Sequence, residues 1–162
     1  VIENASVLSK LSIGESISKV NTDLAGLLKE VAKEFESQLG TAGMKINFQL
    51  PESCFMSVNP IISEVPKNYI GNAIKYAAKG GEIDLILRDE GGHTTFRVND
   101  YGTPIPADKR DAVFRRSVQL AKGKKKGRGL GLAIVQRIAT AHDAEVGVEE
   151  SSSGGNSFFL KF

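Results

Sequence analysis

The chain contains 162 residues, of which 41% are hydrophobic and 25% are charged, a composition typical of one globular domain with a buried core. Its formal net charge of +2 is too small to indicate nucleic acid as the partner, and no stretch approaches the roughly 18 apolar residues of a membrane span. Cys54 is the only cysteine, which excludes a disulfide framework and a paired-cysteine zinc site. Because the chain begins at Val1, we expect it to be a piece of a longer protein.

The first third of the chain predicts two helices and a strand. Apolar residues at helical spacing in residues 1–12 indicate the end of a helix. Asn21 and Thr22 offer an N-cap for a second helix, which should end near Gly40. In residues 44–50, apolar and polar side chains then alternate, which is the pattern of a strand with one buried face.

A third helix should begin at Asn59 and Pro60, because the asparagine can cap the first turn and a proline there gives up no hydrogen bond. It should run to about Ala78 and end before the glycine pair that follows. Pro66 lies inside this range, where its ring and its missing N–H predict a kink.

The second half of the chain predicts two strands joined by a hairpin turn, a short helix, a lysine-rich loop, a further helix and two closing strands. In chain order these elements cover residues 83–87, 96–100, 108–114, 122–128, 130–141, 145–149 and 157–162. Strands with helices on one face predict a two-layer α/β sandwich.

A glycine-rich run follows the lysine-rich loop and opens an amphipathic stretch. Glycines let the backbone approach an anion closely, and the first turn of a helix attracts phosphate. The run therefore predicts a phosphate cradle, although a glycine loop that binds nothing stays open as an alternative. It consists of Gly127, Arg128, Gly129, Leu130, Gly131 and Leu132.

Polar residues also recur along the third predicted helix. Glu64, Asn68, Asn72 and Lys75 follow one another at steps of four, four and three, which places them on one helical face. An asparagine carbonyl is a suitable oxygen ligand for Mg²⁺, and Asn72 is the predicted magnesium residue. The alternative is a solvated helix face, and Glu64 is interpreted as surface.

These motifs together resemble sensor histidine kinases, in the superfamily shared with gyrase, Hsp90 and MutL. Residues 68–76 (NYIGNAIKY) resemble the N box of that family, 100–105 (DYGTPI) the G1 box, 111–114 (DAVF) a reduced F box, and the glycine run the G2 box. The boxes occur in the family's order, and the resemblance covers nearly the whole chain. It implies the Bergerat ATP-binding fold, a mixed, largely antiparallel sheet covered on one face by three helices.

The resemblance also implies roles for individual residues, with ATP and Mg²⁺ as cofactors. Catalytic roles are implied for Asn68, Asn72 and Lys75, with Asn72 as the metal ligand. Tyr76 resembles the aromatic residue against adenine, and Asp100 the carboxylate that accepts from the adenine amino group. The implied ATP site comprises Asn68, Asn72, Lys75, Tyr76, Asp100, Gly102, Ile105, Gly127, Arg128, Gly129, Leu130 and Gly131.

Plainer roles stay open for several of these residues. Tyr76 could be a core residue, Asp100 could cap a turn, and the lysine run could be a solvated loop. The two histidines, His93 and His142, sit in a turn and at a helix end, so neither is interpreted as a phosphoacceptor.

Three departures from the family's pattern lie near the implied site. Pro104 replaces the second glycine of the usual G1 box, and Arg128 stands where the G2 box commonly has a small residue. Arg115, Arg116 and Ser117 replace the usual Glu-Pro-Phe of the F box. These departures motivate an alternative function, a nucleotide-binding regulatory module without catalysis.

The resemblance predicts residues 1–14 as the end of a dimerisation and phosphoacceptor domain with its linker, and residues 15–162 as a catalytic and ATP-binding domain. The implied activity is transfer of the ATP γ-phosphoryl group to a histidine on that upstream domain, for relay to a response-regulator aspartate. The implied partners are the upstream domain and the regulator, without nucleic acid, and a homodimer is expected only for the full-length protein. A cytoplasmic domain is expected, with membrane anchoring of the full-length protein left open.

Overall fold

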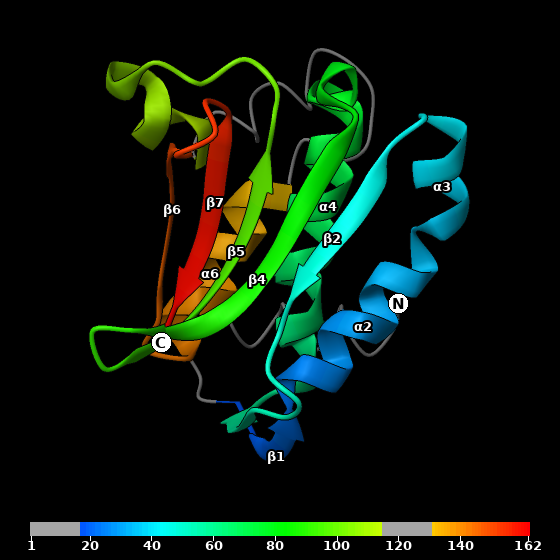
Figure 1. Ribbon diagram of the computed structural model, residues 1–162. Helices are drawn as coiled ribbons and strands as arrows, with labels where there is room; N and C mark the ends of the chain where they lie inside the picture. Colours follow the sequence, from blue (N-terminus) through cyan, green and yellow to red (C-terminus); the bar gives the residue numbers. More distant parts are fainter. Residues whose placement is uncertain (1–16, 115–130) are drawn as a thin grey trace.

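A five-stranded sheet forms one layer of the molecule, as the computed structural model in Figure 1 shows for residues 17–114 and 131–162. The parallel pair is β2 (Lys45–Gln49) with β4 (Glu82–Glu90), and the other neighbours are antiparallel. The predicted fold class, with its mixed and largely antiparallel sheet, is therefore confirmed. In spatial order the strands are β2 (Lys45–Gln49), β4 (Glu82–Glu90), β5 (His93–Asp100), β7 (Asn156–Lys161) and β6 (Glu145–Glu150).

The helices form the second layer and cover one face of this sheet (Figure 1). Each has an apolar stripe that is buried against the strands. Among the described residues, no helix is long and apolar enough to cross a membrane. The covering helices are α2 (Leu24–Glu34), α4 (Glu64–Tyr76) and α6 (Gly131–Ala141), and the shorter elements are α3 (Glu36–Thr41), η1 (Pro60–Ser63), η2 (Ala78–Gly80), η3 (Ala107–Lys109) and the helical residues 110–114.

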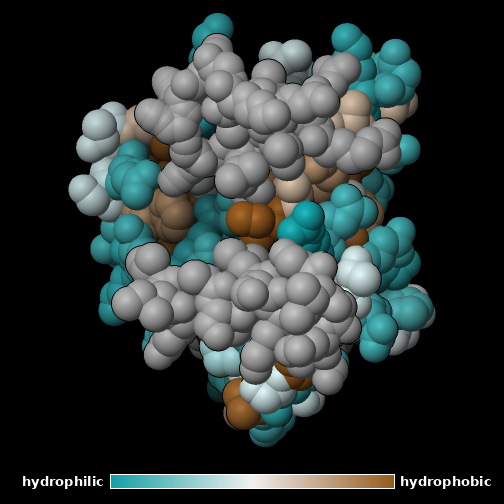
Figure 2. Space-filling view, turned by 180° about the vertical axis from the view of Figure 1, so that it is seen from behind, coloured by the Kyte–Doolittle hydropathy of each residue, from teal (hydrophilic) through white to brown (hydrophobic). Residues whose placement is uncertain are grey.

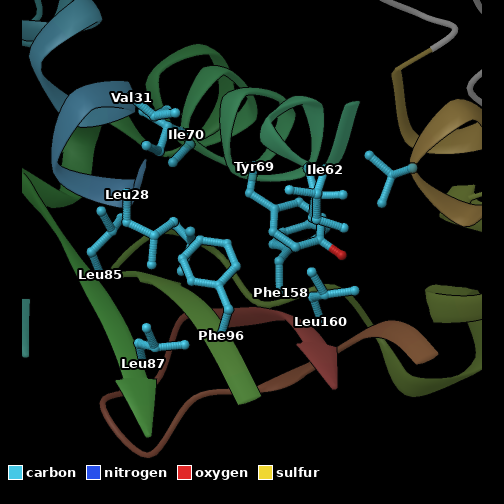
Figure 3. Close-up of a cluster of buried hydrophobic side chains, with 14 of the residues drawn as sticks. Leu28, Val31, Ile62, Tyr69, Ile70, Leu85, Leu87, Phe96, Phe158 and Leu160 are labelled. Carbon is cyan, nitrogen blue, oxygen red and sulfur yellow. The ribbon is translucent and has the colours of Figure 1, made fainter. Parts of the chain in front are cut away.

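The core fills the space between the two layers, and Tyr69 of α4 lies near its centre. The Tyr69 ring packs 5.3 Å from the ring of Phe158 and 6.2 Å from that of Phe96, measured between centroids. Its hydroxyl donates to the Phe159 carbonyl of β7 at 2.8 Å, which satisfies the polar atom of a fully buried side chain. Figure 3 shows this cluster, with labels on Leu28, Val31, Ile62, Tyr69, Ile70, Leu85, Leu87, Phe96, Phe158 and Leu160.

A two-stranded ribbon, absent from the sequence-based prediction, is formed by the strand before the first covering helix and a strand after β2. It pairs β1 (Val20–Asp23) with β3 (Phe55–Val58) in antiparallel register. The predicted N-cap at Asn21 and Thr22 is therefore wrong, because both residues lie in β1. The cap is Asp23, whose Oδ1 accepts from Ala25 N at 3.2 Å and also from Cys54 N at 2.8 Å.

The third predicted helix is divided before Pro66, in the turn where a kink was expected. Asn59 does cap the predicted start, accepting from Ile61 N at 2.8 Å, but the first four residues form the 3₁₀ turn η1. The α-helix α4 begins only at Glu64, so Pro66 falls in its first turn. A missing N–H costs nothing there, because first-turn N–H groups have no partner within the helix.

Candidate functional site

The polar residues of α4 lie on the face opposite to its buried stripe. Asn68 and Asn72 are partly buried, and Lys75 and Tyr76 are exposed at the end of the helix. From Asn68 to Tyr76 the axis rises about 12 Å, at about 1.5 Å per residue. This face is long enough for an extended ligand to lie along it. Seen from behind in Figure 2, the described surface carries both hydrophilic and hydrophobic residues.

The start of α6 approaches the start of α4 closely. A Cβ atom built on Gly131 would overlap Oδ1 of Asn68, so only glycine fits here without displacement. The Nδ2 of Asn68 donates to the Glu64 carbonyl at 2.6 Å, and this hydrogen bond fixes the orientation of the amide group. The structure therefore brings Gly131 and Asn68 together, although they lie in different predicted boxes.

At the other end of α4, Tyr76 is 72% exposed, so the alternative interpretation of Tyr76 as a core residue is wrong. The Lys75 Nζ lies 5.3 Å from the centroid of the Tyr76 ring. An exposed aromatic face beside a cation can stack on a flat, electron-rich ligand. Glu64, interpreted as surface, has a side chain only 27% exposed and forms an ion pair with Lys67 at 3.7 Å.

Asp100 ends β5 as a buried carboxylate, only 3% exposed. Its Oδ1 accepts from the backbone N–H groups of Gly102 and Asn156, each at 3.0 Å. The bond to Gly102 is the turn cap that the sequence left open as an alternative. Within the part of the chain that the structure describes, its Oδ2 has one long contact, 3.4 Å to the Asn156 side chain, and so keeps capacity to accept a further hydrogen bond.

The loop after Asp100 packs against the end of α4. A Cβ on Gly102 would lie only 2.8 Å from the Cβ of Ala77, the residue after Tyr76. This close approach places the Asp100 carboxylate and the exposed Tyr76 at the same end of the helix. Ile105 is partly buried and packs on the core, with its N–H donating 2.8 Å to the side chain of Asn156.

Asn156, at the start of β7, is a site residue that the sequence reasoning missed. Its side chain reaches both Asp100 and the loop of residues 103–105. The sequence offered only a weak signal, an asparagine directly after the Gly154-Gly155 turn. Asn156 is 56 residues from Asp100 in the sequence, so no local pattern could predict the contact between them.

Tyr101 fastens the same loop to the uncovered face of the sheet. Its hydroxyl donates to Oδ2 of Asp84 at 2.7 Å, while Oδ1 of Asp84 accepts from Asn47 at 2.8 Å. The hydrogen bond to the Asp84 carboxylate raises the pKa of Tyr101 to about 12, because ionisation would place two negative charges together. Tyr101 therefore stays a hydrogen-bond donor at neutral pH.

Four of the predicted ATP-site residues, 127–130, lie outside the described residues, as do the departures at 115–117 and Arg128. His142 is buried between Asn59 and Ile138, and His93 is exposed with Nδ1 2.8 Å from the Phe162 carbonyl. A pocket of about 440 Å³ lies elsewhere, between β6, α6 and the helical residues 110–114, and no predicted site residue lines it.

The described part of the protein offers few side chains that could bind a metal ion at this site, so a bound nucleotide would have to supply most of the metal ligands. Asn72 has no hydrogen-bond partner for its amide among the described residues, and an amide oxygen is a suitable ligand for Mg²⁺. Within residues 17–114 and 131–162, no cluster of three or more His, Cys, Asp or Glu side chains could hold a metal ion. Phosphate oxygens and water would have to supply most of the remaining ligands.

Comparison with known proteins identifies the family. Residues 58–162 match the sequence profile of the "Histidine kinase-, DNA gyrase B-, and HSP90-like ATPase" family. That match covers more than half of the chain. The chain therefore belongs to this ATPase family, as the resemblance of its motifs predicts.

Similar proteins are sensor kinases. Adaptive-response sensory kinase SasA of Nostoc sp. (strain PCC 7120) is 32% identical over 141 residues, which cover 85% of this chain and 35% of SasA. Full-length ShkA in complex with AMPPNP is 27% identical with a TM-score of 0.76, covering 95% of this chain and 33% of that chain. A nucleotide-free catalytic domain of histidine kinase ThkA, 23% identical with a TM-score of 0.78, shares the fold over 90% of this chain and 95% of its own. The chain spans about a third of the length of SasA.

Proposed function

We propose that this chain is the ATP-binding catalytic domain of a two-component sensor histidine kinase. In this proposal residues 1–14 end an upstream dimerisation domain, and residues 15–162 bind ATP. The γ-phosphoryl group passes to a histidine of the upstream domain and then to a response-regulator aspartate. The family match and the similarity to sensor kinases support the proposal.

The observation that carries the proposal is the buried Asp100 carboxylate at the same end of α4 as the exposed Tyr76 ring. A carboxylate oxygen with spare acceptor capacity can accept from the exocyclic amino group of adenine, and Tyr76 can stack on the base. In this assignment the triphosphate extends along α4, with Lys75 and Asn68 on the phosphate side. Gly131, which lies against Asn68, is on the same side, and residues 127–130 stay predicted phosphate contacts outside the described residues.

Asn72 is the residue that would hold Mg²⁺ in this proposal. The ion, when bound, would neutralise phosphate charge. The contribution of the protein is then to position the nucleotide, to fix the base through Asp100, and to exclude water around the phosphates. The phosphoacceptor is neither His93 nor His142. His142 is buried with both ring nitrogens bonded, and His93 is the first residue of β5 rather than a turn residue as predicted, with its Nδ1 2.8 Å from the Phe162 carbonyl.

The decisive experiment is calorimetric titration with a non-hydrolysable ATP analogue, with and without Mg²⁺, on wild type and on Asp100→Asn. Three donors surround Oδ1 of Asp100, so the carbonyl of the new asparagine must face them. Its NH₂ group then faces the ligand, where it cannot accept from adenine. Loss of one charge-assisted hydrogen bond, about 1.5–3 kcal/mol, predicts roughly 10- to 100-fold weaker binding.

Asp84→Asn is the matched control. Like Asp100, Asp84 is a buried carboxylate, and it lies near the loop after β5 because it accepts a hydrogen bond from Tyr101. It should bind the analogue within about twofold of wild type, because it removes a charge but no base contact. Equal affinity of Asp100→Asn and wild type would contradict the assignment of the base to Asp100.

The kinase activity needs a separate test. With ATP and Mg²⁺, the domain should transfer phosphate to its own dimerisation domain supplied in trans, and Asn72→Ala should abolish the transfer. Mg²⁺-dependent binding without any transfer would instead support the alternative function, a nucleotide-binding regulatory module.

A further inference from the structure

The Asn156 side chain joins three parts of the loop that follows β5. Its Nδ2 donates to the Thr103 carbonyl at 3.0 Å and lies 3.4 Å from both oxygens of Asp100, while its Oδ1 accepts from Ile105 N at 2.8 Å. The side chain is only 6% exposed. Reversing the amide would place oxygen against a carbonyl and a carboxylate, so this network admits one orientation.

The two backbone groups that Asn156 pairs with flank Pro104. Thr103 offers its C=O and Ile105 its N–H, the same pair of groups that a neighbouring strand would engage. Pro104 itself has no N–H to offer, and its ring restricts the backbone between the two partners. The Asn156 side chain therefore makes the two hydrogen bonds that a neighbouring strand would make with residues 103–105, a segment whose backbone Pro104 restricts.

The same residue orients the carboxylate. Two of the donors around Asp100 come from Asn156, one from its backbone N–H and one from its side chain. The backbone N–H groups of Gly102 and Asn156 both donate to Oδ1, whereas the Asn156 Nδ2 lies 3.4 Å from each oxygen. Among the described residues, Oδ2 therefore has this long contact alone. Donors on one oxygen fix the rotation of the carboxyl group, so the other oxygen is held ready for a ligand.

We propose that Asn156, matched to Pro104, is a positioning residue that sets the preference for adenine over 6-oxopurines. This inference rests on the proposed function, since it needs the base to sit at Asp100. A carboxylate accepts from a 6-amino group and repels a 6-carbonyl oxygen, but only while its direction is fixed. If Asn156 no longer fixes the Asp100 carboxylate, the carboxylate can turn away from the 6-carbonyl oxygen of the base. The preference for adenine over 6-oxopurines should then decrease more than the stability of the fold does.

The test measures the ratio of the ATP and ITP affinities by calorimetry, because the two ligands differ only at the purine ring edge around position 6. Asn156→Ala should lower the ATP-over-ITP ratio about tenfold, the effect expected for losing hydrogen bonds to a charged group. Ser157→Ala is the matched control, as Ser157 is the next residue of β7, equally buried, and bonded to Arg97 on the uncovered sheet face. It should leave the ratio unchanged.

Pro104→Gly provides a second variant at an exposed position, and it answers the question even if Asn156→Ala fails to fold. It should lower the ratio about two- to threefold, and should have no further effect in the Asn156→Ala background. Wild type that binds neither nucleotide would overturn the proposed function itself. Wild type that prefers ATP, with variants that keep the same ratio, would overturn only the positioning role of Asn156.

Discussion

His142 should make the stability of this domain depend on pH. Its Nε2 accepts from the backbone N–H of Asn59 at 3.0 Å, so the ring proton must be on Nδ1, which lies 2.8 Å from the Ile138 carbonyl. Burial lowers the pKa of His142 from its ordinary 6.5 and nearby Lys19 lowers it further, while the hydrogen bond to the Ile138 carbonyl and the charge of Asp143 oppose this shift without cancelling it. A second proton on Nε2 would face the Asn59 N–H, so the folded state excludes it.

The direction of the effect follows from proton linkage. Above pH 6.5 the histidine is neutral in both states, and its contribution to stability is complete. As the pH falls below 6.5, the unfolded chain binds a proton that the folded protein refuses, so stability decreases until the lowered pKa is reached. One such proton changes the free energy of unfolding by at most about 1.4 kcal/mol per pH unit.

Urea denaturation of wild type and His142→Gln at pH 7.5, 6.5 and 5.5 measures this term. At pH 7.5 the variant should lose about 1–3 kcal/mol, because glutamine cannot reproduce both buried hydrogen bonds. The difference in the free energy of unfolding between wild type and His142→Gln should then become smaller as the pH falls, because only wild type has the buried histidine that titrates. Parallel curves for wild type and His142→Gln would refute this reasoning.

Three further outcomes follow from the geometry. The bidentate bond from Arg97 lowers the pKa of Glu90 from 4.5 to about 2, so the stability it adds is present above pH 4.5 and lost as the pH falls toward 2. Because the Glu90 side chain is 26% exposed, we expect this contribution to the free energy of unfolding to be about 1–2 kcal/mol. It is measured as the loss of stability between pH 4.5 and pH 2 that occurs in wild type and not in Glu90→Gln. Gly131→Ala should cost about 1–3 kcal/mol in thermal unfolding by overlapping Asn68, and adding Asn68→Ala should recover most of it. Tyr69→Phe should cost about 1–2 kcal/mol in urea, because a buried carbonyl of β7 loses its donor; an unchanged midpoint would contradict that role.

Local patterns predicted most of the elements. The five sheet strands and α4 occur close to where alternation and helical spacing place them, and Asn59 caps the predicted start. The ribbon of β1 and β3 was missed because strands of four residues carry too few alternations to stand out. The place of Pro66 in the first turn of α4 was not predicted, because it depends on where the α-helix begins, which the 3₁₀ turn before it decides.

The residues of the candidate site divide in the same way. Glu64, Asn68, Asn72 and Lys75 share a helical face, and a face is a property of spacing along one element. The sequence by itself therefore determined the family, the two layers and the polar side of α4. Only the tertiary structure decided that Asn156 reaches Asp100, because hydrogen bonds between residues so far apart form only when the sheet brings β5 and β7 side by side.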